Sequence, residues 1–287
     1  MAKRGFLGGK EIIMLATLND ILPAARREKR AVGAFNIGNY ETAIAIFRAA
    51  EELQLPVIVQ VFSRLVDSGH AGPLGALVRH LAEKATVPVV LHLDHGSSLE
   101  QVRIALDAGF TSVMLDASKL PYAENVALVK EAVRLAHAAG ATAEGEIGHV
   151  PMNGSTMAVS DPEETLRFYE ETQVDALAVS IGTVHGFYKA EPNIRVDLCA
   201  KLAEMIPVPL VLHGGSGTPR DKVRAVIRNG IAKINVATEY LYEFQMATKE
   251  RVNECGDKFV STDILMAPVV DRCYEFIRDD LAFFAGR

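Results

Sequence analysis

Cysteine is scarce in this chain of 287 residues, and no two cysteines form a C-x-x-C pair. The three that occur are Cys199, Cys255 and Cys273, so at least one thiol has no partner. This argues against a disulfide framework and is typical of a protein in the reducing cytoplasm. Net positive charge is also lacking, because the formal charge is −6. We therefore expect neither a nucleic acid nor an anionic membrane as partner.

Long hydrophobic runs are missing as well. No segment reaches the roughly 18 uncharged apolar residues that a membrane span needs. Residues 1–13 carry basic residues but lack the apolar stretch of a signal peptide, and we expect them to be a disordered N-terminal extension. No linker or low-complexity stretch divides the rest, so residues 14–287 are expected to form one domain.

A repeating pattern predicts the fold. Proline begins several β-branched runs, each preceded by a segment with helical periodicity, as in "LQLPVIVQV", "ATVPVVLHL" and "IPVPLVLHG". Strands are predicted at 31–36, 56–61, 88–94, 112–117, 141–147, 176–182, 209–214 and 233–238. Alternation of this kind indicates an α/β protein with a parallel sheet. Eight such units predict a (β/α)8 TIM barrel, with an extra C-terminal helix at 267–284. The alternative, an open doubly wound sheet, would show fewer strands and a G-x-G-x-x-G turn, which is not found.

Three histidines follow the ends of separate predicted strands: His95, His185 and His213. Active sites of TIM barrels lie at the carboxyl ends of the strands, so these side chains are expected to converge. One such histidine is more often a hydrogen-bonded structural residue, but three neutral imidazoles with an open fourth position are typical of catalytic zinc. His92 lies one layer deeper, and a role in orienting the site stays open for it. His149 stays unassigned.

Carboxylates and glycines accompany these histidines. Asp94, Asp116, Glu144 and Glu146 also end strands, where they act either as acid/base groups or as partners that orient histidine ligands. The stretch "HGGSGT" before the helical "PRDKV" is either a tight turn or a phosphate cradle, and its place after the seventh strand favours the cradle. Asn235 and Thr238 offer further donors. The polar loop at 148–160 is predicted to be a lid.

The motifs "AFN", "LHLDH", "MLDAS", "EGEIG", "GTVHGFYK", "LHGGSG" and "INVAT" resemble those of the class II, metal-dependent ketose-bisphosphate aldolases. The resemblance runs from about Met14 to the C-terminus. It implies one Zn²⁺ per subunit on His95, His185 and His213, and an aldolase that cleaves a ketose phosphate to dihydroxyacetone phosphate and an aldehyde. Asp94 matches the residue that takes the C4 hydroxyl proton, and Glu146 matches the acid/base residue at C3.

The resemblance implies further site residues and partners. Asp116, with Glu146, matches an alternative metal position, and Asn36 and Ser63 match substrate-side positions. The residues that match the phosphate site are Gly186, Lys189, Gly214, Ser216, Asn235 and Thr238. A monovalent cation, Na⁺ or K⁺, often accompanies that site. A cytoplasmic homodimer or homotetramer is implied, acting on fructose or tagatose 1,6-bisphosphate, another phosphorylated ketose or a keto-sugar acid.

Departures from the family pattern fall at Gly96, in the surroundings of the metal, and in the lid and "FSRLVDSG" after the second strand, where the aldehyde half of the substrate is expected to bind. The arginine for the distal phosphate is not assigned; Arg64, Arg272 and Arg278 are candidates. A Schiff-base aldolase would need a lysine inside the barrel, but Lys233 is predicted to start its strand at the opposite rim. A sugar-phosphate-binding barrel without catalysis is disfavoured because Asp94 and the histidines are all present.

Overall fold

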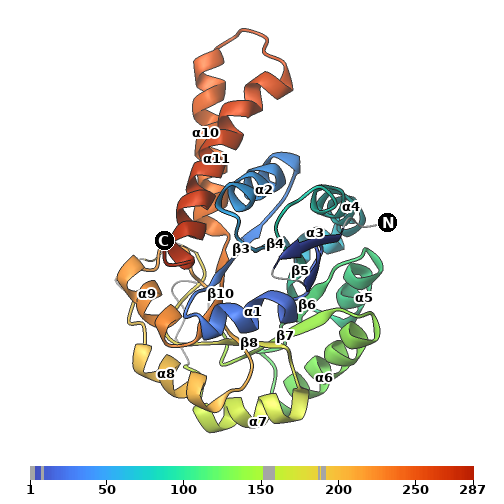
Figure 1. Ribbon diagram of the computed structural model, residues 1–287, viewed down its shortest axis with the longest axis vertical. Helices are drawn as coiled ribbons and strands as arrows, with labels where there is room; N and C mark the ends of the chain where they lie inside the picture. Colours follow the sequence, from blue (N-terminus) through green and yellow to red (C-terminus); the bar gives the residue numbers. More distant parts are fainter. Residues whose placement is uncertain (1–3, 8–9, 151–158, 187, 189–191) are drawn as a thin grey trace.

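The parallel strands close into a barrel. The computed structural model describes residues 4–7, 10–150, 159–186, 188 and 192–287. In this part of the chain, eight strands follow one another around the ring in the order β10-β3-β4-β5-β6-β7-β8-β9 (Figure 1). They are β3 (Val32–Asn36), β4 (Val57–Phe62), β5 (Val89–Gly96), β6 (Ser112–Leu115), β7 (Thr142–Ile147), β8 (Ala176–Val179), β9 (Leu210–Leu212) and β10 (Ile231–Val236). The predicted (β/α)8 TIM barrel is confirmed.

Helices form the outer layer, as Figure 1 shows. Those of the barrel units are α2 (Tyr40–Leu53), α3 (Ser63–Asp67), α4 (Ala71–Ala82), α5 (Leu99–Asp107), α6 (Tyr122–Ala138), α7 (Pro162–Thr172), α8 (Val196–Met205), α9 (Arg220–Arg228) and α10 (Thr238–Cys255). Outward-facing strand residues pack against them and form one continuous apolar cluster. Strands covered in this way on the outside are expected to be apolar on that face throughout, as they are here.

A helix closes the floor of the barrel. The helix α1 (Leu18–Arg27) places Leu18, Ile21 and Leu22 in an apolar cluster with inward-facing residues from the amino-terminal ends of the strands. Above this floor the inward positions become polar: His92, Glu144 and others are completely buried. The interior therefore has an apolar half that stabilises the barrel and a polar half at the carboxyl ends of the strands.

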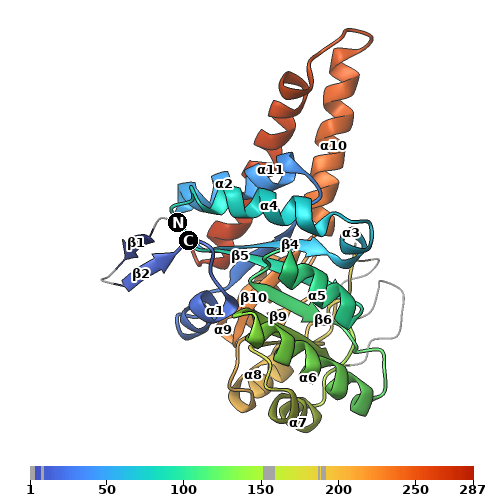
Figure 2. The same cartoon turned by 90° about the vertical axis from the view of Figure 1, so that its right-hand side faces the viewer.

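A two-helix arm projects from the barrel. The arm consists of α10 and α11 (Thr262–Phe284), and both views show it rising beyond the barrel (Figures 1 and 2). The predicted terminal helix at 267–284 is confirmed, but it starts earlier and continues through Pro268. The arm is anchored at its base, where the hydroxyl of buried Tyr240 donates to the Thr42 carbonyl at 2.6 Å. Between the helices, Phe259 is 94% exposed.

A short hairpin precedes the barrel. The strands β1 (Arg4–Leu7) and β2 (Lys10–Ile13) pair with each other in antiparallel fashion, beside the barrel in Figure 2. The chain then joins the barrel floor, where Val89 donates to the Met14 carbonyl at 2.7 Å and Ala16 donates to the Val89 carbonyl at 2.8 Å. Among the described residues, no helix has the length and apolar character that crossing a bilayer requires.

The closed floor gives a stability prediction. Leu22, on α1, is completely buried in the apolar cluster of the floor. Leu22→Ala therefore leaves a cavity and is expected to lower the free energy of unfolding by about 2–5 kcal/mol. The same substitution at Leu120, which is 43% exposed, is expected to change it by no more than about 0.5 kcal/mol. Urea unfolding followed by circular dichroism measures both. Equal losses in the two variants would contradict a floor built on α1.

Candidate metal centre and active site

Three histidines converge at the carboxyl ends of the strands. His95 lies at the end of β5, His185 follows β8 and His213 follows β9. Each offers a ring nitrogen, and these nitrogens lie within 4.8 Å of one another. The ring centroids are 4.6 Å apart for His95 and His213 and 5.0 Å apart for His95 and His185. Sequence-distant segments thus meet at one point inside the mouth of the barrel.

A bulge in β5 lets two consecutive residues share this interior. Adjacent strand residues normally point to opposite faces, so Asp94 and His95 could not both face inward on a regular strand. Here the register with β6 shifts between Leu93 and Gly96, and His95 adopts the left-handed conformation, with φ of 50°. A β-bulge of this kind re-aims a side chain. Asp94 and His95 consequently both reach the histidine cluster, with 4.0 Å between Asp94 Oδ1 and His95 Nε2.

Glycine is needed at position 96 because the bulge brings the backbone of β6 very close to that of β5. A Cβ atom on Gly96 would lie 2.5 Å from the carbonyl oxygen of Met114. The same approach allows the Asp116 amide to donate to the Gly96 carbonyl at 2.8 Å. This explains the sequence Asp-His-Gly at the end of the third predicted strand: the carboxylate and imidazole enter the site, and the glycine permits the bend.

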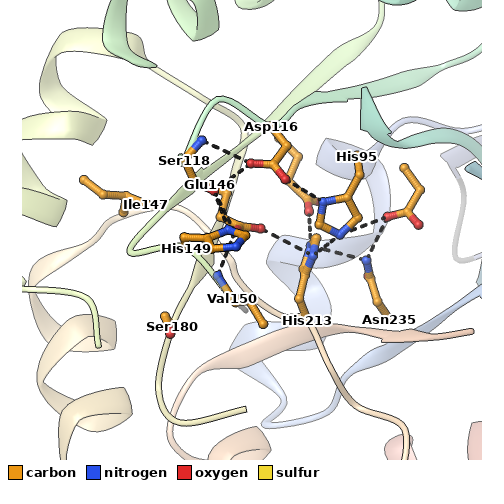
Figure 3. Close-up of polar contacts among 12 residues, drawn as sticks. His95, Asp116, Ser118, Glu146, Ile147, His149, Val150, Ser180, His213 and Asn235 are labelled. Carbon is orange, nitrogen blue, oxygen red and sulfur yellow. Dashed lines mark hydrogen bonds and ion pairs between the residues drawn. The ribbon is translucent and has the colours of Figure 1, made fainter. Parts of the chain in front are cut away.

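Carboxylates orient two of the three imidazoles. His95 Nδ1 lies 2.9 Å from Asp116 Oδ2 (Figure 3). His213 Nε2 lies 2.8 Å from Glu144 Oε1. The remaining nitrogens, His95 Nε2 and His213 Nδ1, are 2.9 Å apart. Carboxylate–histidine pairs of this type fix the ring orientation in metal sites. The free nitrogens can take part in one coordination sphere, since zinc–nitrogen distances are about 2.0–2.1 Å.

A buried carboxylate oxygen without a partner faces the same point. Glu146 Oε2 is buried and has no hydrogen-bond donor among the described residues, and it lies 3.6 Å from His213 Nδ1. The other oxygen, Oε1, accepts from Ser118 Oγ at 3.1 Å and from the Val150 amide at 3.0 Å. His95, Asp116 and Glu146 form a second group whose ligand atoms lie within 4.8 Å of one another. A buried carboxylate without compensation is costly, so these donor sets fit a divalent cation.

Asp94 is held as a carboxylate by two amides. Asn36 Nδ2 donates to Oδ2 at 2.8 Å and Asn235 Nδ2 donates to Oδ1 at 3.2 Å. Burial alone raises the pKa of Asp94, but His95, His213 and the hydrogen bond from Asn36 outweigh burial and lower it. Asp94 is therefore ionised at neutral pH and directed into the cavity, as a general base must be.

The imidazoles differ in their protonation. Burial lowers the pKa of His185 to about 4, and the neighbouring His213 and His95 act in the same direction. His185 is thus neutral at pH 7 and able to bind a metal. Burial also lowers the pKa of His95, but Asp94 and Asp116 outweigh burial and raise it to about 9. A cation at this point takes the place of that proton.

A buried ion pair lies beneath the histidines. Lys233 Nζ donates to Glu144 Oε2 at 2.7 Å, and both side chains are completely buried. His92 lies beside them, with Nε2 3.5 Å from Lys233 Nζ and Nδ1 2.8 Å from Ser112 Oγ. Our placement of Lys233 at the opposite rim was wrong: β10 starts at Ile231, two residues before Lys233, and Lys233 lies on the same inward face as Asn235, so its ammonium group reaches the buried Glu144. Through Glu144 this ammonium group supports the orientation of His213.

Of the predicted phosphate residues, Gly186 follows β8, Gly214 and Ser216 follow β9, Thr238 follows β10 and Asn235 lies within β10. Gly186 and Gly214 have φ of 85° and 68°, and a Cβ on Gly214 would lie 2.4 Å from the Val184 carbonyl oxygen. Ser216 Oγ accepts from the Glu239 amide at 3.4 Å, and Thr238 begins α10. Lys189 and most of the predicted lid, residues 151–158, lie outside the described residues. Ser63, which the resemblance places at a substrate-side position, is the first residue of α3.

Three contributors were not assigned from the sequence. Ser118 Oγ lies 2.7 Å from Asp116 Oδ1 and 3.0 Å from His149 Nδ1, so it links these groups to Glu146. The hydroxyl of Tyr188 donates to the Gly214 carbonyl at 3.2 Å and lies 3.0 Å from Thr218 Oγ1. Tyr188 thereby ties the loop after β8 to the loop after β9. "MLDAS" contains Ser118, but no spacing signal distinguishes His149 or Tyr188.

Comparison with known proteins gives a consistent result. Residues 16–285 match the family described as fructose-bisphosphate aldolase class-II. The 6-phospho-5-dehydro-2-deoxy-D-gluconate aldolase of Bacillus subtilis (strain 168) is 39% identical over 279 residues, covering 94% of this chain and 95% of that protein. The fructose-bisphosphate aldolase of Geobacillus stearothermophilus is 41% identical over 249 residues, covering 82% and 85%. The crystal structure of the YdjI aldolase from Escherichia coli K12 superposes with a TM-score of 0.84 at 33% identity, covering 94% and 97%.

The bulge in β5 gives a testable prediction. Gly96→Ala forces the new methyl group against the Met114 carbonyl, and we expect a loss of about 1–3 kcal/mol in unfolding free energy together with weaker metal binding. Gly72→Ala is the matched control, because a Cβ there meets nothing within 4 Å. Urea unfolding and metal titration of both variants check this. Unchanged stability and metal affinity in Gly96→Ala would show that the close approach is not needed.

Proposed function

The chain belongs to the class II fructose-bisphosphate aldolase family and is an aldolase, a carbon–carbon lyase, and on this premise we propose that it is a metal-dependent enzyme that reversibly cleaves a ketose phosphate into dihydroxyacetone phosphate and an aldehyde. The observation that carries the proposal is the juxtaposition of three imidazoles, whose ligand atoms lie within 4.8 Å of one another, with an ionised aspartate. Cleavage needs a base at one carbon and charge stabilisation at another, and the site offers both within a few ångströms.

We propose that His95, His185 and His213 hold the cation and that zinc is its identity, because three neutral imidazoles with an open position suit catalytic zinc. Asp116 and Glu146 would provide an alternative position for it. When bound, the cation supplies Lewis-acid stabilisation of the negative charge that develops on the substrate carbonyl oxygen. The His95–Asp116 and His213–Glu144 pairs set the direction of the ring nitrogens in advance.

Asp94 is proposed to take the proton of the C4 hydroxyl group as the C3–C4 bond breaks. Its two oxygens are fixed by hydrogen bonds from Asn36 and Asn235. Its side chain is therefore held in one orientation, with the remaining lone pairs available to the reacting group. Glu146 is proposed to exchange the proton at C3. It has one oxygen anchored by Ser118 and Val150 and the other without a donor, which leaves that oxygen available for proton transfer.

The loops after β8, β9 and β10 are proposed to bind the phosphate next to the substrate carbonyl. Two glycines with positive φ allow the backbone to approach an anion closely, and Ser216 and Thr238 add hydroxyl groups. Lys189 stays a predicted contributor of positive charge here, and a monovalent cation stays a prediction for these loops. Asn36 and Ser63 stay predicted contacts for the rest of the substrate.

Two substrate classes fit this proposal. Fructose or tagatose 1,6-bisphosphate is one, in keeping with relatives named fructose-bisphosphate aldolase. A phosphorylated keto-sugar acid is the other, in keeping with a relative named 6-phospho-5-dehydro-2-deoxy-D-gluconate aldolase. Both carry a phosphate next to the ketone and an anionic group at the opposite end. The same residues would break the carbon–carbon bond in either class.

Schiff-base chemistry is disfavoured, although Lys233 is inside the barrel. Its ammonium group is completely buried and bound to Glu144 at 2.7 Å, beneath His213. A nucleophilic lysine must reach the substrate carbonyl, whereas this ammonium group is held by Glu144 beneath the metal ligands. Borohydride together with substrate should accordingly leave the enzyme active.

We also expect a cytoplasmic homodimer or homotetramer. The projecting arm formed by α10 and α11, with Phe259 94% exposed, offers apolar surface for a contact between copies.

A panel assay tests the function. Release of dihydroxyacetone phosphate is measured from fructose and tagatose 1,6-bisphosphates and from 6-phospho-5-dehydro-2-deoxy-D-gluconate, before and after removal of metal with a chelator. We expect cleavage of at least one compound, its loss on chelation and its recovery when Zn²⁺ is added. Turnover that survives complete removal of metal would contradict the metal-dependent mechanism, and cleavage of none of the compounds would contradict the substrate classes.

Two variants distinguish the proposed role of Asp94 as a base from the proposed role of His213 as a metal ligand. Asp94→Asn is expected to lower kcat by at least about 100-fold, as loss of a general base does, while metal content stays near that of the unaltered enzyme. His213→Ala is expected to lose both the metal and the activity. Metal content by mass spectrometry and kcat by the coupled assay are measured for each. Near-normal kcat in Asp94→Asn would contradict the role of Asp94 as the base. Normal metal content in His213→Ala would contradict the role of His213 as a metal ligand.

A further inference from the structure

His149, which lies just after β7, is close to the carboxylate that is proposed to exchange the C3 proton. Its Nδ1 atom is 3.0 Å from Ser118 Oγ, and that hydroxyl oxygen is 3.1 Å from Glu146 Oε1 (Figure 3). The distance from His149 Nδ1 to Glu146 Oε1 is 3.6 Å, which is too long for a hydrogen bond. His149 therefore reaches Glu146 through Ser118.

The Ser118 hydroxyl lies between two carboxylates. It is 2.7 Å from Asp116 Oδ1 and 3.1 Å from Glu146 Oε1. Its single proton serves one of these oxygens at a time, whereas its lone pairs can accept from a third group. In the tautomer that carries its proton on Nδ1, His149 donates to those lone pairs and holds the oxygen where it still reaches Glu146. Without His149, the shorter contact would draw the hydroxyl toward Asp116.

Buried contacts determine where His149 lies. Ser160 Oγ donates to the Ile147 carbonyl at 2.7 Å and accepts from the Ser180 amide at 2.9 Å. Gly148 has φ of 71°, and a Cβ atom on it would lie 2.5 Å from Ser160 Oγ. Ser160 and Ser180 are both buried. The direction in which the chain leaves β7, and with it the place of His149, is therefore fixed from within the protein.

The Glu146 carboxylate has one anchored oxygen and one open oxygen. Besides its contact with Ser118, Oε1 accepts from the Val150 amide at 3.0 Å. The main-chain carbonyl of Glu146 accepts from Asn125 Nδ2 at 3.0 Å, so the backbone is held as well. Among the described residues Oε2 has no donor, and it lies 3.6 Å from His213 Nδ1. Because both oxygens belong to one planar group, holding Oε1 also fixes the direction of Oε2.

From these contacts we propose that His149 is a positioning residue, which acts through Ser118 to hold the Glu146 carboxylate with Oε2 directed at the histidine cluster. This inference rests on the proposed function, in which Glu146 exchanges the C3 proton. His149 and Ser118 neither bind the substrate nor take its proton. Their loss slows proton exchange and leaves the binding of substrate and metal in place.

The test follows deuterium uptake at C3 of dihydroxyacetone phosphate in D2O by NMR, with the metal-loaded enzyme. In this exchange Glu146 takes the C3 proton, the C–H electron pair passes into the enediolate, and a deuteron acquired by the carboxyl group from solvent returns to C3. Glu146→Gln is expected to lower the exchange rate by at least about 100-fold. His149→Ala and Ser118→Ala are each expected to lower it by about 10- to 100-fold, as misplacement of a reacting group does. The KM for dihydroxyacetone phosphate and the metal content are expected to change by less than about threefold.

Two further measurements separate positioning from general damage to the fold. If His149 and Ser118 act in series, the double alanine variant loses no more than the larger single loss, whereas independent effects multiply. His149→Asn places an amide nitrogen as far from Cβ as Nδ1 is, and is expected to restore exchange to within about threefold of the unaltered enzyme. In a crystal structure of metal-free His149→Ala, the Glu146 carboxylate is expected to be rotated away from its present orientation.

His70→Ala is the matched control. His70 Nδ1 lies 2.9 Å from Ser68 Oγ in an exposed pair, so this variant breaks the same kind of contact outside the site, and it should leave exchange unchanged. Near-normal exchange in His149→Ala together with a loss in Glu146→Gln would overturn the proposal and leave the proposed function standing. So would multiplied losses in the double variant, loss of metal in His149→Ala or an unrotated carboxylate. If Glu146→Gln keeps normal exchange, or if the unaltered enzyme neither exchanges nor cleaves, the proposed function itself is wrong and this inference falls with it.

Discussion

The site depends on one local departure from strand geometry. A regular strand cannot direct Asp94 and His95 into the same cavity, because consecutive side chains alternate between its faces. The shifted register after Leu93 and the left-handed backbone of His95 resolve this conflict, and Gly96 makes room for the carbonyl of the next strand. Such a backbone state is unfavourable for a residue with a side chain and persists only where its surroundings enforce it. Here Asp116 does so twice, through its amide to Gly96 and through its carboxylate to His95.

The polar half of the interior is organised by mutual compensation of charge. Lys233, Glu144 and His213 form one buried chain, and Asn36, Asp94 and Asn235 form another that touches it. Each buried charge alone would cost several kcal/mol, so these groups are tolerated in the interior only as a set. The apolar floor supplied by α1 carries the stability that this polar half lacks. The result is a set of site side chains that hold their orientation before any ligand arrives.

Much of this architecture was predictable from the sequence because strand and helix periodicities are local. The strand ends followed from the apolar runs, and once the barrel was inferred, the convergence of His95, His185 and His213 followed from topology alone. Lys233 was misplaced because β10 begins two residues earlier than its predicted start, and no composition signal marks that boundary. The contributions of His149 and Tyr188 were not predicted, for another reason. They lie outside the regular strands, so their contacts depend on loop paths that periodicity does not determine.

The closed floor also determines how reactants and products enter and leave the barrel. With α1 filling the end of the barrel opposite the histidines, the described interior is blind-ended, and reactants and products share one opening. Every compound that enters the site and every fragment that leaves it therefore passes through the mouth at the carboxyl ends of the strands. A molecule lodged in that mouth would block entry and exit together.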